Sequence, residues 1–210
     1  MCTTIERIEC VGPDGRARRI FFDDGSARTT SAAAMKAIRL GVGDAVAYSA
    51  VDASLAEIEP ELIRARALQL LGYRERSVHE LSERLLANGY PAEAVSSVVE
   101  RYAQVGLVDD HRFALAWVGA RSRAGYGRRR IMRELAEKGV SEEHILAALS
   151  EALEHDEVAR ATAALRGRGA RDAKDRERLI RRLVARGFEY RVAIQSVDAV
   201  TSGDASDADA

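Results

Sequence analysis

Hydrophobic positions along this chain follow one pattern that is used three times. The three stretches begin at Ser77 (SVHELSERLLANGYPAEAVSSVV), Gly127 (GRRRIMRELAEKGVSEEHILAAL) and Asp175 (DRERLIRRLVARGFEYRVAIQSV), and they align without a gap. Successive copies start 50 and 48 residues apart. A fixed period of this length indicates one supersecondary unit that is reused, and whose apolar face is covered by stacked neighbours.

Each copy is predicted to contain two helices joined by a corner. Apolar residues four apart, such as Leu81 and Leu85, lie on one side of a helix. Gly89 then ends that helix, because glycine adopts the left-handed conformation of a C-terminal cap without strain, and Tyr90 supplies the apolar contact beside it. The equivalent residues are Ile131, Leu135, Gly139 and Val140 in the second copy, and Leu179, Leu183, Gly187 and Phe188 in the third.

A further helix is expected before each copy, at residues 62–71, 110–118 and 158–165, where apolar or alanine residues recur at helical spacing. The sequence therefore predicts a mainly α protein with three tandem three-helix repeats in an elongated array. We expect the repeats to occupy residues 60–107, 108–155 and 156–200.

Residues 1–59 have a different pattern and predict a small mixed α+β module. Asp24-Gly25 is a strong hairpin signal between two short strand-like runs, and residues 4–11 could pair as another strand. A short helix over residues 31–40, capped by Ser31 and ended by Gly41, and a further strand through Val46, Tyr48 and Val51 complete the module. Pro60 marks the expected join, and residues 201–210 are polar and acidic enough to predict a disordered tail.

Composition excludes several classes of protein. No run of residues approaches the roughly 18 uncharged apolar residues of a membrane span, and the first ten residues carry charges where a signal peptide would be apolar. Cys2 and Cys10 match no zinc or redox motif, and the four histidines have no paired-ligand spacing. We infer no catalytic residue, cofactor or metal site, and we expect a cytoplasmic protein that makes no membrane contact and is a monomer when free.

The net charge of −1 hides strong local imbalance. Residues 121–133 contain six arginines and no acid, and residues 160–191 contain eleven basic and four acidic residues. Arginines four apart on the second helix of each later three-helix unit would form basic ridges suited to phosphates or to a carboxylate-rich protein. The alternative is a solvated surface, or pairing with Glu134, Glu137, Glu142 and Glu143.

The stretch from Ala67 to Leu149 resembles the RecX regulators of the bacterial recombinase RecA. The residues that carry the resemblance are Arg76-Ser77 with Glu80-Leu81, Asp110 with Arg112-Phe113-Ala114, Gly127 with Arg130-Ile131, and Leu135 with Lys138-Gly139. Farther on, Arg186-Gly187-Phe188 with Tyr190 is similar to the family's third-repeat signature. The N-terminal module also resembles the leader of longer family members.

The resemblance implies repeats that lie in the groove of a RecA filament on DNA and lower its ATPase, strand-exchange and co-protease activities. The basic ridges would then be candidate contacts with the RecA filament, and could also contact DNA phosphates directly. The candidate contacts are Arg121, Arg123, Arg128, Arg129, Arg130, Arg133, Arg178 and Arg182. Two alternatives stay open: a nucleic-acid-binding module that acts without RecA, because three-helix units resemble helix-turn-helix domains, and a helical adaptor with another partner.

Overall fold

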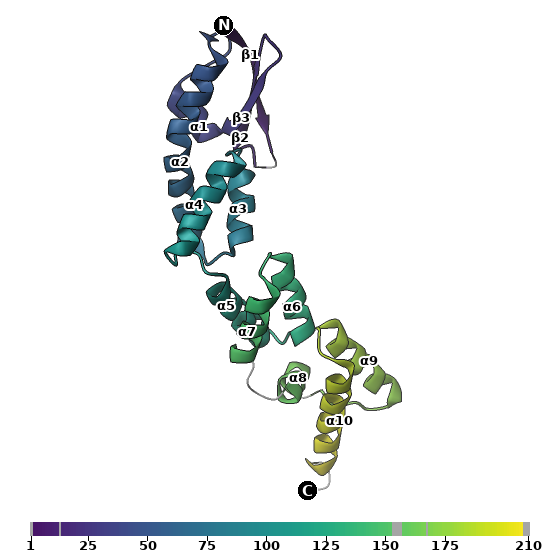
Figure 1. Cartoon of the computed structure of the whole chain (residues 1–210). Coiled ribbons are helices and arrows are strands. Elements are labelled where there is room, and N and C mark those ends of the chain that lie inside the picture. Colours follow the sequence, from purple (N-terminus) through teal and green to yellow (C-terminus); the bar gives the residue numbers. More distant parts are fainter. Residues whose placement is uncertain (1, 13, 153–156, 167, 208–210) are drawn as a thin grey trace. The chain divides into compact units, whose positions relative to one another are not determined.

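The chain folds into two compact units, Met1–Asp109 and Asp110–Ala210. The structure is a computed structural model that describes residues 2–12, 14–152, 157–166 and 168–207, with side chains described as far as residue 202. Helices dominate both units, and the strands gather at the N-terminal end (Figure 1). The predicted class, a mainly α protein with a small N-terminal β-containing module, is therefore confirmed. Within the described parts of the chain, no helix is both long and apolar enough to pass through a membrane.

An antiparallel sheet opens the first unit. Its strands are β1 (Thr3–Val11), β2 (Ala17–Phe22), β3 (Ala27–Ser31) and β4 (Ala45–Val46), in the order β3-β2-β1-β4. The hairpin between β2 and β3 is the one predicted from Asp24-Gly25, and Gly25 has a φ of 83° there. The pairing of β1 with β2 confirms the strand expected over residues 4–11.

The first unit has one helix between β3 and β4 and another after β4, and both differ from the sequence prediction. Helix α1 (Ala32–Ile38) is capped by the Ser31 hydroxyl as expected, but it ends at Arg39 in a left-handed conformation and not at Gly41. The further strand predicted through Val46, Tyr48 and Val51 is confirmed only at Val46, which lies in β4, because Tyr48 and Val51 open the long helix α2 (Tyr48–Tyr73). Val51 continues a buried stripe down this helix, which the short segment did not reveal.

Helix α2 runs through Pro60, where a boundary was expected. Buried positions recur along it at steps of three or four, at Val51, Leu55, Glu59, Ile63, Ala67 and Leu70. Proline inside a helix costs about 3 kcal/mol, and burial of this stripe on both sides of Pro60 outweighs that cost. Val51 and Leu55 pack with Ile5, Ile20 and Phe22 of the sheet. The other end packs in the core of the first repeat, so one helix serves both the N-terminal module and that repeat.

The first repeat is completed by α3 (Val78–Leu86) and α4 (Ala92–Gln104). Ser77 caps α3 by accepting the Glu80 N–H at 3.1 Å. The corner residue Gly89 has a φ of 88°, and a Cβ there would lie 2.5 Å from the Thr30 carbonyl oxygen and 2.7 Å from the Ala17 Cβ. The corner therefore lies directly against the sheet, at a distance that only glycine permits.

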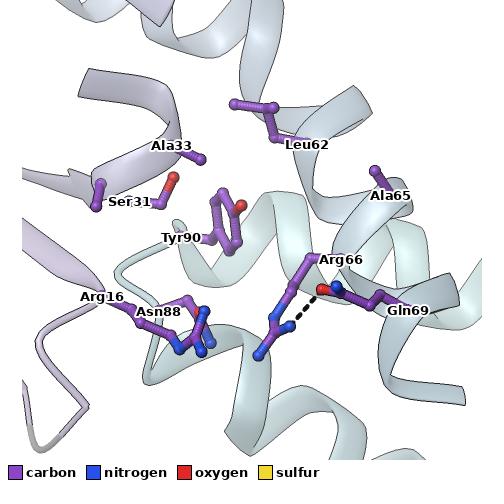
Figure 2. A pocket seen from close by; sticks show the side chains of 10 residues that line it. Arg16, Ser31, Ala33, Leu62, Ala65, Arg66, Gln69, Asn88 and Tyr90 are labelled. Atoms are coloured by element: carbon purple, nitrogen blue, oxygen red, sulfur yellow. Dashed lines mark hydrogen bonds between the residues drawn. The ribbon is translucent and has the colours of Figure 1, made fainter. Parts of the chain in front are cut away.

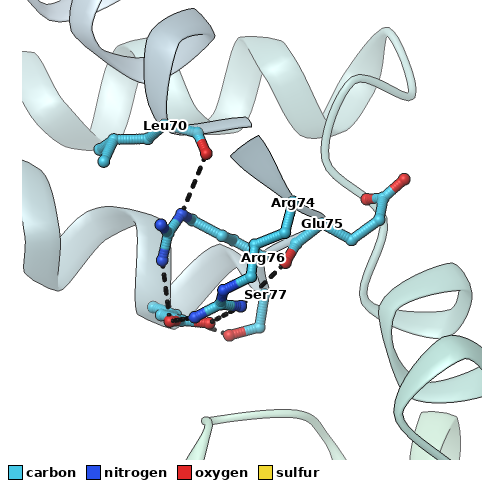
Figure 3. Close-up of polar contacts among 6 residues, drawn as sticks. Leu70, Arg74, Glu75, Arg76 and Ser77 are labelled. Carbon is cyan, nitrogen blue, oxygen red and sulfur yellow. Dashed lines mark hydrogen bonds and ion pairs between the residues drawn. The ribbon is translucent and has the colours of Figure 1, made fainter. Parts of the chain in front are cut away.

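Arg76 joins α2 to α3 within this repeat. Its Nε donates to the Leu70 carbonyl at 3.2 Å, and its Nη1 lies 2.9 Å from Glu80 Oε1, which also pairs with Arg74 (Figure 3). Burial lowers the pKa of the Arg76 guanidinium, as does the nearby charge of Arg74, whereas Glu80 opposes the shift. The Arg76-Ser77 and Glu80-Leu81 motif is therefore a structural link between helices.

The second unit contains six helices in its described residues. They are α5 (Asp110–Arg123), α6 (Arg128–Glu137), α7 (Glu142–Ala152), α8 (Glu157–Leu165), α9 (Ala173–Ala185) and α10 (Tyr190–Asp207). Two cores form, one around Ile131 and Leu135 and the other around Leu179 and Leu183. Helix α10 continues to Asp207, well into the segment expected to be a disordered tail, and residues 208–210 lie outside the described residues.

The glycine corner of the third repeat caps α6, the second helix of the second repeat. The Gly127 N–H donates to the Arg186 carbonyl at 2.9 Å, and the Arg129 N–H donates to the Gly187 carbonyl at 3.0 Å. These are N–H groups at the start of α6, which an isolated helix leaves without partners. A Cβ on Gly127 would overlap the backbone of Gly187 and Phe188. The contact therefore requires a glycine on each side.

Substitution of Gly127 by alanine should destabilise the second unit. The added Cβ has no space, and overpacking of this kind costs about 1–3 kcal/mol in unfolding free energy. Urea unfolding followed by the fluorescence of Trp117, the single tryptophan, measures this loss. The control is Gly41→Ala, at a glycine with open space around it and no left-handed conformation. Equal stability of the two variants would contradict the prediction.

Glu59 is a buried carboxylate that ties α2 to the sheet. It accepts a hydrogen bond from the Thr30 hydroxyl at 2.5 Å, and its other oxygen lies 3.2 Å from Arg28 Nη2. Arg28 also pairs with Asp52 at 2.7 Å. Burial raises the pKa of Glu59 above its ordinary value, against the opposing effects of Thr30 and Arg28.

The stability of the wild-type chain relative to a Glu59→Gln variant should therefore depend on pH. A raised pKa in the folded state means that Glu59 stabilises the fold most when it is protonated. This contribution is lost as the pH rises through the folded pKa, from about pH 4 upward. Urea unfolding of both proteins between about pH 4 and pH 7 should show the wild type losing stability relative to Glu59→Gln. A constant difference across that range would refute the raised pKa.

Candidate functional site

The six arginines predicted as contacts in the second repeat, residues 108–155, fall into two groups. Arg121 and Arg130 converge on one carboxylate, with their Nε atoms 2.6 Å and 3.0 Å from the two oxygens of Glu134. The Trp117 Nε1 also donates to Glu134, at 3.2 Å. The Arg121 guanidinium lies 4.5 Å from the centre of the Trp117 ring, and the Arg130 guanidinium lies 4.3 Å from that of Tyr126.

This cluster of Trp117, Arg121, Tyr126, Arg130 and Glu134 holds the second copy together. Glu134 is only 13% exposed, and burial alone would raise the pKa of its carboxyl group. The hydrogen bond from Arg130, the charge of Arg121 and the hydrogen bond from Trp117 together outweigh burial and lower this pKa. Arg121 and Arg130 therefore have an internal partner, and their guanidinium groups are engaged within the fold.

The other arginines of this copy lie nearer the solvent. Arg123, Arg129 and Arg133 are exposed, and Arg128 is half-buried. Arg133 lies 3.7 Å from Glu137, but both side chains are 67% exposed. An exposed pair of this kind contributes about 0–1 kcal/mol and is easily exchanged for another partner. Arg129 and Arg133, four residues apart on α6, form an exposed basic ridge on that helix.

In the third copy, Arg178 and Arg182 line an open hollow of about 770 Å³ beside the segment before α9. Arg168 and Arg171 line the same hollow from that segment, together with Asp175. Arg178 is 72% exposed and lies 2.8 Å from Asp175. Four guanidinium groups and one carboxylate give this hollow an excess of positive charge. Analysis of helix ridges alone did not single out Arg168 and Arg171, because they precede the helix.

The first unit has a hollow of its own, of about 480 Å³, between α1, α2 and the Gly89 corner. Figure 2 shows Arg16, Arg66 and Asn88 near one another at one side of it, with Tyr90 above them. Arg66 donates to the Gln69 side chain at 2.5 Å. Polar groups line one side of this hollow, and Leu62, Ala33 and Ala65 line the rest. None of these residues was predicted as a contact.

Comparison with known proteins identifies related sequences. Residues 64–101 match the family model described as RecX, first three-helix domain, and residues 109–149 match RecX, second three-helix domain. The regulatory protein RecX of Pelodictyon phaeoclathratiforme is 39% identical over 129 residues, which cover 59% of this chain and 79% of that relative. RecX of Mycolicibacterium vanbaalenii is 38% identical over 151 residues, covering 66% of this chain and 82% of the relative.

Solved structures share the fold. A crystal structure of RecX from Lactobacillus salivarius aligns with a TM-score of 0.59 and 19% identity, over 67% of this chain and 96% of that one. Another crystal structure, titled regulatory protein RecX, aligns with a TM-score of 0.57 and 20% identity, over 90% of this chain and 96% of that one.

The repeated three-helix units define a helical-repeat protein. Among such proteins, the level of identity and the coverage of its relatives decide the family. The chain belongs to the RecX family of regulatory proteins.

Glu134→Ala should destabilise the second copy much more than Glu137→Ala. Removal of Glu134 leaves the half-buried Arg121 and Arg130 without their shared acceptor, at a cost of about 1–3 kcal/mol. Glu137 lies on the same helix in an exposed pair, so its removal should cost less than about 0.5 kcal/mol. Urea unfolding followed by Trp117 fluorescence compares the two variants. Because the pKa of Glu134 is lowered, the difference should shrink as the pH falls.

Proposed function

We propose that this chain binds the RecA filament on DNA and restrains it, lowering its ATPase, strand-exchange and co-protease activities. Membership of the RecX family supports this role, since its relatives are named regulatory proteins. Such a partner would place the chain in the cytoplasm. We expect the free chain to be a monomer and to contact DNA phosphates as well as protein when it binds.

One observation carries the proposal. The second helices of the second and third repeats, α6 and α9, present arginines that the fold itself does not need. Arg129 and Arg133 are exposed on α6, and Arg178 is exposed on α9 with Arg182 half-buried beside it. Arg133 pairs with Glu137 and Arg178 with Asp175, each within one helix at the surface, where ion pairs contribute little. A partner rich in carboxylates or phosphates would engage them at small cost.

The proposal narrows the set of predicted contacts. Arg129, Arg133, Arg178 and Arg182 stay as candidates for the filament, together with Arg123 and Arg128. Arg121 and Arg130 act mainly through Glu134, so their substitution would change the fold as well as the surface. The candidate contacts are therefore distinct from Arg121 and Arg130, which support the helix on which Arg129 and Arg133 lie.

The direct test is the single-strand-DNA-dependent ATPase of the cognate RecA, measured with and without the full chain. We expect the rate to fall at substoichiometric amounts of the chain, because a protein that binds along a filament affects many subunits at once. An unchanged rate over a broad range of salt would reject the proposal.

The double variant Arg129→Glu and Arg133→Glu should inhibit the ATPase less, by roughly tenfold or more in the concentration needed for half-inhibition, since close like charges oppose binding. Its helix content by circular dichroism should match the wild type. The control is Arg84→Glu with Arg101→Glu, which makes the same change in charge at exposed positions of the first unit. Equal loss in both double variants would assign the effect to net charge and remove the α6 ridge as a contact.

The arginine-lined hollow of the third copy also favours the alternative of a nucleic-acid-binding module that acts without RecA. Such a module would bind DNA with a steep salt dependence. When there is enough DNA to saturate both proteins, it would leave the RecA ATPase rate unchanged. The ATPase test therefore separates the two functions.

A further inference from the structure

A small hollow in the second unit is lined by four arginines. It has a volume of about 260 Å³ and lies between the end of α5, at residues 122–125, and the C-terminal half of α8. Among the described residues that line it, none is acidic. The arginines are Arg123, Arg160, Arg166 and Arg186. They come from three separate segments of the chain, so the grouping arises only in the folded unit.

Arg160 lies on α8 and contributes a half-buried cation with spare hydrogen-bonding capacity. Its side chain is only 20% exposed; Nη1 donates to the Ser122 hydroxyl at 3.3 Å, and Nη2 lies 3.9 Å from Glu157. Its Nε is buried and has no hydrogen-bond partner among the described residues. A buried donor without an acceptor costs about 1–3 kcal/mol, more for charged groups. An anion in the hollow would offset that cost.

Arg186 is fixed at the hollow by the glycine corner that follows α5. Its Nη1 donates to the Gly125 carbonyl at 3.2 Å, and a Cβ on Gly125 would lie 2.8 Å from that nitrogen. Gly125 has a φ of 77°, which favours glycine on its own account. The Gly125-Tyr126-Gly127 segment therefore leaves space for a guanidinium group.

The other two arginines lie at helix ends with exposed side chains. Arg123 ends α5, and Arg166 follows α8 with a φ of 54°, a left-handed conformation that is uncommon outside glycine. This backbone turn brings the Arg166 position to the lining of the hollow. Both side chains can move toward a ligand without breaking any contact that the fold requires.

The positive charge of the four arginines and the small volume of the hollow together indicate which ligand fits it. Glu157 lies 3.9 Å from Arg160 Nη2, and it also accepts a hydrogen bond from the backbone N–H of Arg128. Four cations around a small volume repel one another unless an anion lies between them. Guanidinium groups match the oxygens of a phosphate in pairs. The hollow is smaller than the roughly 300–1,000 Å³ of sites that enclose whole small molecules, so it fits a single phosphate group better than a nucleotide.

We propose that this arginine hollow binds a backbone phosphate of nucleic acid. The choice of DNA as the source of the phosphate rests on the proposed function, which it deepens by assigning the DNA contact to one site. Arg160 and Arg186 form the fixed floor of the site, and Arg123 and Arg166 close on the phosphate from the exposed side.

The test is the binding of a fluorescein-labelled single-stranded oligonucleotide to the full chain, without recombinase, followed by anisotropy over a series of salt concentrations. The variant is Arg123→Ala with Arg166→Ala, which removes two exposed side chains and should leave the fold intact. We expect its Kd to rise roughly fivefold or more, and the slope of log affinity against log salt to fall in magnitude by about 0.7 for the lost phosphate contact.

The matched control is Arg181→Ala with Arg191→Ala, which removes two exposed arginines of the same unit outside the hollow. An equal rise in Kd for control and variant, or an unchanged Kd for the variant, would overturn the proposal. Inorganic phosphate supplies a second arm: if it raises the melting temperature of the wild type and not of the variant, while DNA binding is unaffected, the hollow takes a free anion only and the assignment to nucleic acid fails.

The RecA ATPase assay separates this inference from the proposed function. Weak DNA binding by Arg123→Ala with Arg166→Ala supports the phosphate site whether or not the wild type inhibits RecA. Loss of the proposed function would instead appear as a wild-type chain that binds DNA and does not inhibit the ATPase. If the wild type inhibits the ATPase normally but Arg123→Ala with Arg166→Ala binds DNA with an unchanged Kd, the phosphate site alone is refuted.

Discussion

Close packing of a glycine corner against its neighbour is the contact on which the rest of this structure depends. Gly89 and Gly187 both adopt left-handed backbone conformations, and both lie where a Cβ would overlap another segment. Gly89 packs on the sheet at Thr30, and Gly187 packs on the start of α6 at Arg130. In the first and third copies the same glycine therefore ends a helix and makes the joint, whereas all three copies share its left-handed conformation at the helix end, including the exposed Gly139.

The repeat itself could be predicted from the sequence because its signals are local. Apolar residues four apart, followed by glycine and another apolar residue, determine a helix, its end and the contact beyond it. The role of α2 could not be predicted in the same way. Pro60 is a strong local boundary signal, and only the packing of Val51 and Leu55 on the sheet, with Ile63 in the next core, shows that the helix continues through it.

The candidate site was predicted only in part, for a related reason. Charge along the sequence shows where arginines are dense, but not which of them have an internal acceptor. Glu134 lies four residues after Arg130, so that pair was within reach of sequence analysis, whereas its contact with Arg121 depends on how α5 packs beside α6. Arg160, Arg166 and Arg186 are distant in sequence from Arg123, and only the fold brings them to one hollow.

Differences between the repeats determine how the second helix of each repeat is capped at its N-terminus. In the first repeat, the second helix α3 is capped by the hydroxyl of Ser77 from the same repeat. The second copy has Gly127 at that position, so the N–H groups of Gly127 and Arg129 are paired by the carbonyls of Arg186 and Gly187. Helix α6 therefore depends on the third copy for its N-terminal cap. Because Arg129 and Arg186 flank this one joint, its backbone hydrogen bonds hold these basic residues of the second and third repeats beside each other.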